Sequence, residues 1–160
     1  MNPFTILRLT PSDLRTALRL MSTFSTGMSS ETALIDFLGD PANILLAAVA
    51  ADQPEAGQAL GMLVGYILPR WERENPMQFL YSIEVLASHR RLGIAAALIG
   101  EFLAIGRRAG CFKAFVLTDG GNTAAMRLYT ATGATRPHRD DVLFVWEAQT
   151  EEGNPVQPAD

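Results

Sequence analysis

The most informative segment of the chain is Ser82-Ile83-Glu84-Val85-Leu86-Ala87-Ser88-His89-Arg90-Arg91-Leu92-Gly93-Ile94-Ala95-Ala96-Ala97-Leu98-Ile99. Its apolar start predicts a strand, its polar middle a turn, and the apolar run from Ile94 a helix. The first N–H groups of a helix have no intrahelical acceptor, and the macrodipole places partial positive charge there. Gly93 and the alanines after it would let an anion approach, and Arg90 and Arg91 add charge. The segment predicts a phosphate or pyrophosphate cradle; the alternative is a solvated helix start with two surface arginines.

The pattern on either side of this segment predicts a mixed sheet. Strands are expected at 5–9, 44–51, 60–68, 77–86, 113–118 and 142–147, with an additional short strand near 135–139. Helices are expected at 14–21, 31–38, 94–108 and 123–132. The strand–helix–strand order across 79–118 requires a parallel crossover, so we expect an α/β (α+β) fold with helices on both faces of the sheet.

Length and composition limit the class of protein. A chain of 160 residues predicts one domain at 1–150, followed by a solvated tail at 151–160. Thirteen basic and seventeen acidic residues give a net charge of −4, which argues against a nucleic-acid partner. The single cysteine, Cys111, excludes an intrachain disulfide, and His89 and His138 are too far apart in sequence to suggest a metal site.

No targeting or membrane-spanning segment is predicted. The N-terminus lacks a basic region followed by an apolar one, and the longest apolar run, 44–51, is far shorter than the ~20 residues that cross a bilayer. We therefore expect a cytoplasmic protein without a membrane partner.

A second motif, Asn122-Thr123-Ala124-Ala125-Met126-Arg127-Leu128-Tyr129-Thr130-Ala131-Thr132-Gly133, follows the next predicted strand. With Arg90-Arg91-Leu92-Gly93-Ile94-Ala95 it resembles the GNAT superfamily of acetyl-coenzyme A-dependent N-acetyltransferases. The first motif matches Gln/Arg-x-x-Gly-x-Gly/Ala, and the second matches Asn-x-x-Ala-x-x-x-Tyr-x-x-x-Gly. The resemblance implies a mixed, mostly antiparallel central sheet of six to seven strands, with helices on both faces and a splay between two central parallel strands.

The resemblance also implies how acetyl-CoA, the cosubstrate, is bound. Backbone N–H groups at the helix start would hold the pyrophosphate, the strand before it would pair with the pantetheine arm, and the second motif would contribute an asparagine. The coenzyme-binding residues implied are Ile83, Val85, Leu86, Arg90, Arg91, Gly93, Ile94, Ala95, Ala96 and Asn122. No metal is required.

Two residues are candidates for proton transfer. Glu84 is the polar member of an apolar strand and would accept the ammonium proton of the substrate, directly or through water; an exposed strand residue or a salt bridge is the alternative. Tyr129 occupies the position in the second motif that implies the acid for the departing coenzyme thiolate. The alternative for Tyr129 is an ordinary buried aromatic.

A finer resemblance is carried by Tyr66-Ile67-Leu68-Pro69-Arg70-Trp71-Glu72, by Tyr81, and by Val85 with the run that begins at His89-Arg90-Arg91. Over about residues 47–133 the chain resembles the type I aminoglycoside 3-N-acetyltransferases. Where that family has an aspartate before the coenzyme loop, this chain has Ser82, and a carboxylate appears two residues later at Glu84, on the same strand face. The family's acidic Asp-Tyr-Gly-Asp-Asp loop is here Asp119-Gly120-Gly121-Asn122, with fewer carboxylates.

Acidic and apolar side chains outside the two motifs are candidates for the acceptor site. Glu72, Asp119 and Asp141 would bind a cationic acceptor, with plain surface charge as the alternative. Apolar side chains either line an acceptor pocket or pack as core: Met21, Phe24, Met28, Trp71 and Phe79.

The sequence thus predicts an N-acetyltransferase that moves acetyl from acetyl-CoA to a primary amine by direct attack. The acceptor is an aminoglycoside-like small molecule or a peptide amine, and a homodimer is compatible with the resemblance. The alternative is a coenzyme A-binding regulatory or scaffold domain without turnover.

Overall fold

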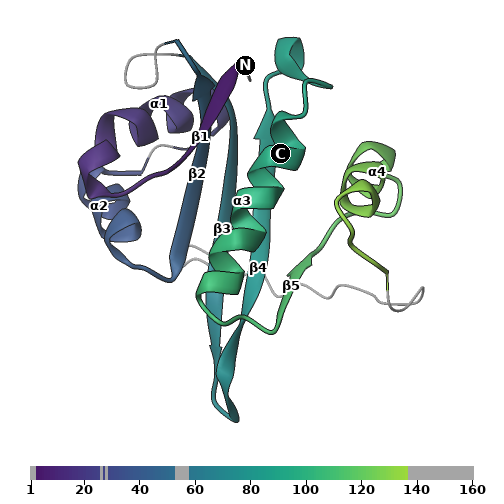
Figure 1. Cartoon of the computed structure of the whole chain (residues 1–160). Helices are drawn as coiled ribbons and strands as arrows, with labels where there is room; N and C mark the ends of the chain where they lie inside the picture. The colour runs from purple at the N-terminus through teal and green to yellow at the C-terminus, as the bar shows by residue number, and fades with distance from the viewer. Residues whose placement is uncertain (1–2, 26, 28, 53–57, 137–160) are drawn as a thin grey trace, which may run out of the picture.

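One five-stranded sheet forms the centre of the computed structural model, which describes residues 3–25, 27, 29–52 and 58–136 (Figure 1). The strands lie in chain order, and their bounds are β1 (Phe4–Arg8), β2 (Asn43–Ala50), β3 (Ala59–Arg70), β4 (Arg73–Val85) and β5 (Lys113–Val116). Neighbours from β1 to β4 are antiparallel, and β4 and β5 are parallel. The predicted mixed sheet is confirmed.

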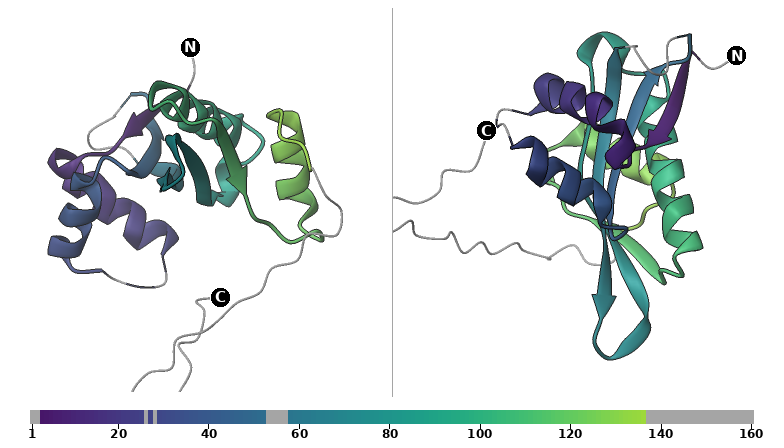
Figure 2. Two further views of the ribbon diagram at one scale, coloured as in Figure 1. Left: turned by 90° about the horizontal axis from the view of Figure 1, so that it is seen from below. Right: turned by 90° about the vertical axis from the view of Figure 1, so that its left-hand side faces the viewer.

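Helices cover both faces of this sheet, as predicted (Figure 2). They are α1 (Leu14–Phe24), α2 (Glu31–Gly39), α3 (Ile94–Arg108) and α4 (Thr123–Ala131), with short 3-10 turns η1 (Pro11–Asp13) and η2 (Ala87–His89). Helices α1 and α2 lie on one face and α3 on the other, while α4 follows β5 at the far edge. The starts of α1 and α2 are fixed locally: Thr10 and Asp13 form a capping box before α1, and the Ser30 hydroxyl accepts the Ala33 N–H.

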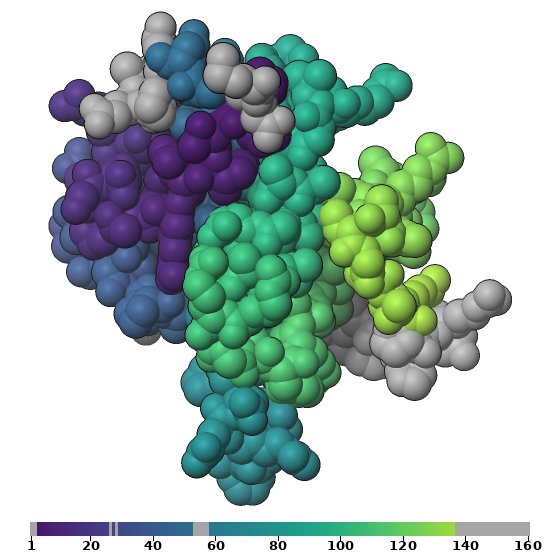
Figure 3. Space-filling model, viewed as in Figure 1, coloured from purple at the N-terminus to yellow at the C-terminus, as the bar shows by residue number. Residues whose placement is uncertain are grey.

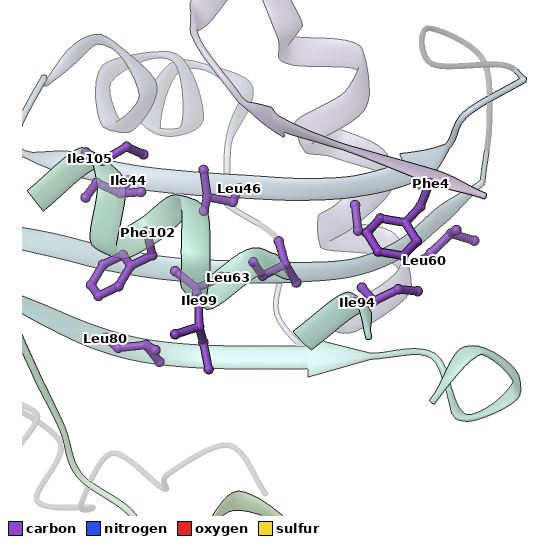
Figure 4. Close-up of a cluster of buried hydrophobic side chains, with 12 residues drawn as sticks. Phe4, Ile44, Leu46, Leu60, Leu63, Leu80, Ile94, Ile99, Phe102 and Ile105 are labelled. Atoms are coloured by element: carbon purple, nitrogen blue, oxygen red, sulfur yellow. The ribbon is translucent and has the colours of Figure 1, made fainter. Parts of the chain in front are cut away.

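Strand β2 lies between two hydrophobic layers, which explains its uninterrupted apolar sequence. Ile44, Leu46 and Ala48 face α3 and join the cluster drawn in Figure 4. Leu45 and Ala47 face the other way, toward α1 and α2. Because both faces of β2 are buried, none of its central positions can be polar.

The layer under α3 is the larger of the two. Side chains of α3 point into the sheet, where they meet residues of four strands (Figure 4). Buried Gln78 is the polar exception: its Nε2 atom donates to the Phe102 carbonyl oxygen at 2.6 Å. This hydrogen bond joins β4 to the middle of α3.

The β3–β4 hairpin is longer than the sequence predicts. The two strands continue to a tight turn at Trp71 and Glu72, and this turn projects beyond the rest of the molecule (Figure 3). Pro69, expected to begin a loop, lies within β3, where the register with β4 shifts between Leu68 and Arg70. A proline lacks the N–H that a ladder needs, so such an irregularity is where a strand accommodates it.

Strands β4 and β5 separate after a short paired segment. Their register covers only Met77–Leu80 against Lys113–Val116, and β4 then runs on to Val85 without β5 beside it. This separation agrees with the predicted splay between two parallel strands, but β5 is the edge strand of the described sheet and not one of two central strands. Of the six to seven strands predicted, five lie in the described residues; 142–147 lies outside them, and residues 135 and 136 are not in a strand. Among the described residues, no helix is long and apolar enough to cross a membrane.

A close approach between β3, β4 and α3 makes the core sensitive at Gly65. A Cβ atom there would lie 2.8 Å from the Phe79 carbonyl oxygen and against the Phe102 ring. We expect Gly65→Ala to lower the free energy of unfolding by about 1–3 kcal/mol in urea denaturation. Gly100→Ala is the control, since a Cβ meets nothing within 4 Å there, and it is expected to stabilise by about 0.5–1 kcal/mol. Equal stability of the two variants would contradict this packing.

Candidate active site

The start of α3 lies at the end of the sheet where β4 and β5 have separated (Figure 1). Its N-cap is Gly93, and no side chain caps it, whereas Ser30 caps α2 and Asn122 caps α4. The N–H groups of the first turn therefore have neither an intrahelical acceptor nor a side-chain one. Arg90 and Arg91 are exposed beside this turn. This arrangement fits an anion. The exposed arginines also fit the alternative of a solvated helix start with two surface arginines, so the cradle stays a prediction.

The backbone of this turn has unusual handedness. Arg91 has a φ of 61°, the only positive φ among described residues other than glycine, and Gly93 has a φ of 82°. A left-handed arginine is uncommon and costs of order 1–3 kcal/mol, which the surrounding structure must compensate. A Cβ at Gly93 would meet nothing within 4 Å, so the space in front of the turn is open. Residues 93–96 can therefore be approached closely by a phosphate group.

One edge of β4 is free beyond the point of separation. The Leu86 N–H donates to the Leu60 carbonyl on the β3 side at 2.9 Å. Since successive residues of a strand direct their N–H and C=O groups to opposite edges, those of Val85 and Ile83 point away from β3, into the splay. The Arg90 Nε atom reaches the Val85 carbonyl from that side, at 3.3 Å. Leu86 was predicted to bind the coenzyme together with Ile83 and Val85, but its backbone groups are already paired. Its N–H donates to Leu60 of β3, and its carbonyl accepts the His89 N–H.

A β-bulge at Tyr81 decides which way the end of β4 faces. Val64 pairs with Ser82 but Gly65 pairs with Leu80, so Tyr81 is an extra residue in the strand. Before the bulge, Leu80 belongs to the core under α3. In a regular strand Ser82 and Glu84 would continue on that face. After the bulge, Ile83 and Val85 pack against that core instead, and Ser82 and Glu84 face α1 and α2.

Glu84 consequently lines a pocket of about 660 Å³ between α1, α2 and the sheet. Glu84 is exposed, as the alternative of an exposed strand residue expects. Among the described residues it takes part in neither a salt bridge nor a side-chain hydrogen bond, so the salt-bridge alternative is not seen there. Met21 and Phe24, two of the apolar candidates, line the same pocket. Ser82 lies beside Glu84, as expected from their spacing.

Aromatic rings extend from the pocket along the sheet. Tyr81 lines the pocket and lies 5.9 Å from the Tyr66 ring and 6.1 Å from the Phe79 ring, between centroids. Phe79 in turn stacks on Phe115 at 4.9 Å. Burial and the neighbouring Tyr81 raise the pKa of Tyr66. Phe79, a candidate pocket residue, contacts the Tyr81 ring but does not itself line the pocket. Tyr81 and Phe37 do line it, and neither was predicted.

Tyr129 lies on the opposite side of β4 from Glu84. It is half-buried on α4 and packs against the core under α3, to which Ile83 and Val85 also belong. Burial raises the pKa of its hydroxyl, so this group keeps its proton at neutral pH. The two predicted catalytic side chains therefore lie on opposite faces of the sheet, Glu84 in the pocket and Tyr129 against the core under α3.

The second motif begins with a capping residue. The Asn122 Oδ1 atom accepts the Ala125 N–H at 3.0 Å, which starts α4. Asp119 builds the turn before it, with its Oδ1 atom accepting the Gly121 N–H and its carbonyl accepting the Asn122 N–H. Both residues therefore have a local structural role between β5 and α4.

Glu72, one of the predicted acceptor acids, lies far from the pocket. Glu72 lies at the tip of the β3–β4 hairpin, ion-paired with Arg70, about 40 Å along β4 from Glu84 at ~3.3 Å per residue. Its own backbone N–H and Arg70 lower the pKa of Glu72. Trp71, at the same tip, is 98% exposed and does not line the pocket. Asp141 and Met28 lie outside the described residues.

No potential metal site occurs in the part of the chain that the structure describes. There, no three histidine, cysteine, aspartate or glutamate side chains gather closely enough to hold a metal ion.

The family of the chain follows from comparison with known proteins. Residues 12–134 match the model of the acetyltransferase (GNAT) family. The chain therefore belongs to this family, which confirms the expected enzyme class, an acetyl-CoA-dependent N-acetyltransferase. None of the curated proteins matches the sequence.

Solved structures of aminoglycoside acetyltransferases share the fold. The enzyme meta-AAC0020 from an uncultured soil metagenomic sample has a TM-score of 0.79 at 21% identity, covering 92% of this chain and 97% of its own. The enzyme HMB0005, also from an uncultured soil metagenomic sample, has a TM-score of 0.70 at 25% identity, covering 89% and 99%. AAC(6')-Iy, in complex with the bisubstrate analog CoA-S-monomethyl-acetylneamine, has a TM-score of 0.72 at 24% identity, covering 91% and 98%.

Proposed function

We propose that this enzyme transfers acetyl to a primary amine bound in the pocket that Glu84 lines, with acetyl-CoA in the splay between β4 and β5. The observation that carries the proposal is the end of β4. Its free edge presents the backbone of Ile83 and Val85 to the splay, while the bulge turns Glu84 into the pocket on the other side. Donor and acceptor can therefore meet at one strand end.

The residues present fit coenzyme A. Its pyrophosphate matches the uncapped start of α3, with N–H groups from Gly93 to Ala96 and positive charge from Arg90 and Arg91. Its pantetheine arm carries amides, which match the N–H and C=O groups that Ile83 and Val85 direct into the splay, much as a strand would; of these, the Val85 carbonyl also accepts the Arg90 Nε–H. Asn122 stands at the start of the neighbouring helix, on the other side of the splay.

Acetyl-CoA supplies an acetyl group already activated as a thioester, so no enzyme nucleophile is needed. Glu84 accepts the ammonium proton, directly or through one water, and so provides the neutral amine. The Val85 N–H lies where it can donate to the carbonyl oxygen as negative charge develops there. Tyr129 holds a proton for the sulfur atom on the opposite side of the strand.

Several finer features stay predictions. The aminoglycoside acceptor, the 3-N position that the resemblance implies, the homodimer and the cytoplasmic location are among them. Asp119 and Asp141 also stay candidates for the acceptor side. Glu72 is a weaker candidate, because its hairpin tip is so far from Glu84.

Release of free thiol from acetyl-CoA tests the proposed activity. We expect release above the rate without amine for at least one primary amine, and none for its N,N-dimethyl derivative, whose tertiary nitrogen cannot form a stable amide. Calorimetry with acetyl-CoA should be done on the same preparation. Binding without thiol release from any amine would instead support the regulatory or scaffold domain.

The cradle can be tested with a charge at Gly93. Asparagine and aspartate both tolerate the left-handed conformation better than most residues and are similar in size, so Gly93→Asn controls for strain and bulk. We expect Gly93→Asp to bind coenzyme A at least tenfold more weakly than Gly93→Asn, or about 1.4 kcal/mol, by calorimetry. The added carboxylate would repel the pyrophosphate. Equal affinities for the two variants would remove the pyrophosphate from this helix start.

A further inference from the structure

The chemistry of the pocket restricts what amine it can accept. Of the fifteen described residues that line it, Glu84 is the only charged one. The other polar groups are hydroxyls, on Ser25, Ser29, Ser82 and Tyr81, and the remaining lining residues are apolar. An ammonium group can be paired at Glu84, but a second one within the pocket would meet no further carboxylate among the described lining residues, and an unpaired charge is costly to bury.

Three different elements each contribute an aromatic side chain to the lining of the pocket. Phe24 comes from α1, Phe37 from α2 and Tyr81 from the bulge of β4. Phe24 and Phe37 pack against the buried cluster under α1 and α2, and the Tyr81 ring is held edge-on by Tyr66 and Phe79. Rings fixed in this way offer flat apolar surface to another ring without a large loss of conformational freedom.

Tyr81 belongs to the aromatic lining and also lies near the carboxylate of Glu84. It is 65% exposed and lies at the bulge, one residue beyond the last residue of β4 that pairs with β5. A tyrosine face attracts a cation, and Tyr81 is three residues from Glu84 along the same strand end. An ammonium group paired with Glu84 would be followed, toward α1 and α2, by aromatic and aliphatic side chains.

We propose that the acceptor is a primary amine with one positive charge, joined by a short chain to an aromatic body, and that polycations are poor substrates. This inference rests on the proposed function and makes it more specific, and it replaces the aminoglycoside acceptor that the resemblance implies. The ammonium lies at Glu84 and the aromatic body among Phe24, Phe37 and Tyr81. A volume of about 660 Å³ is within the range of ordinary small-molecule sites, so one or two fused rings are accommodated.

The experiment compares amines that differ by one feature, with the full chain and acetyl-CoA and with thiol release as the readout. The probes are ethylamine, para-methylphenethylamine and para-(aminomethyl)phenethylamine. The third compound has nearly the same shape as the second and carries a second positive charge. We expect kcat/KM for the para-methyl compound to be at least tenfold above that for each of the other two. Phe24→Ala should remove most of the difference in kcat/KM between the para-methyl compound and ethylamine. Ile35→Ala should preserve that difference, because Ile35 is an exposed residue of α2 outside the pocket.

A gain of charge provides the second test. Ser82→Asp places a second carboxylate in the pocket beside Glu84, and Ser82→Asn is the control of similar size. We expect Ser82→Asp to lower the ratio of kcat/KM for the para-methyl compound to kcat/KM for the para-aminomethyl compound at least fivefold. Ser82→Asn should leave this ratio unchanged. This change requires that both ammonium groups enter the pocket and does not follow from a change of shape alone.

The outcomes separate the two proposals. Thiol release that is fastest with the para-aminomethyl compound, with an aminoglycoside or with a peptide N-terminus overturns the inference about the acceptor and leaves the acetyltransferase standing. Acetyl-CoA binding without thiol release from any amine overturns the proposed function, and the inference with it.

Discussion

Tyr129→Phe is expected to lower kcat for acetyl transfer by roughly 100- to 10,000-fold, the range typical of losing a general acid. The substitution removes one hydroxyl and keeps the ring that packs against the core under α3. Coenzyme A affinity and the free energy of unfolding should change little, since neither depends on that proton. Steady-state kinetics together with calorimetry measure both parts of this expectation.

The pKa of Tyr129 adds a pH dependence to this prediction. Burial raises that pKa, so the hydroxyl stays protonated through neutral pH and beyond the ordinary tyrosine value of about 10. The wild-type rate should therefore show no loss on the alkaline side below about pH 10 that can be assigned to this group. Tyr66→Phe is the control, because Tyr66 is also partly buried with a raised pKa but does not line the pocket. A normal kcat for Tyr129→Phe would return Tyr129 to a packing role and leave water as the acid.

Glu84→Gln is expected to lower kcat/KM at neutral pH by roughly 100-fold or more, since general bases contribute about 10²–10⁴. Glutamine keeps the shape and polarity of the side chain but can no longer accept the ammonium proton. The deficit should shrink as the pH rises toward about 10, where an alkyl amine loses its proton to solvent without help from the enzyme.

This pH trend separates a base from a binding group. If Glu84 only attracted the cation, Glu84→Gln would raise KM with kcat unchanged, and the neutral amine formed at high pH would bind no better. A variant that keeps a wild-type kcat at neutral pH would contradict the role of Glu84 as the base.

Much of the fold could be predicted from periodicity and from local start and stop signals. The positions of α2 and α3 and helices on both faces of the sheet are confirmed. These features depend on neighbours in sequence: an apolar period, a capping serine at Ser30, a glycine at the end of α2. The extension of β3 through Pro69 was not predictable in this way, because it depends on pairing with β4 rather than on the preference of proline.

The direction in which Glu84 points is the main feature of the site that could not be predicted from the sequence. Spacing indicates that Ser82 and Glu84 share a face, but only the extra residue at Tyr81 determines that this face is the pocket and not the core under α3. A bulge arises from how two strands pair, and neither strand shows it alone. For the same reason, Tyr81 could not be recognised as a pocket residue. The positions of Phe37 and Trp71 depend instead on how α2 packs on the sheet and on how far β3 and β4 pair, and neither follows from local sequence.

The most direct test of acetyl transfer at the end of β4 is a single turnover with acetyl-CoA labelled in its acetyl group. The enzyme is in excess, para-methyl phenethylamine is the acceptor, and protein and amine are analysed separately by mass spectrometry. Direct attack within the site predicts that the label appears on the amine nitrogen at the rate of thiol release and never on the protein, and that Glu84→Gln slows both equally. Label that passes first through a side chain such as Cys111, or thiol release without acetylated amine, would contradict the account.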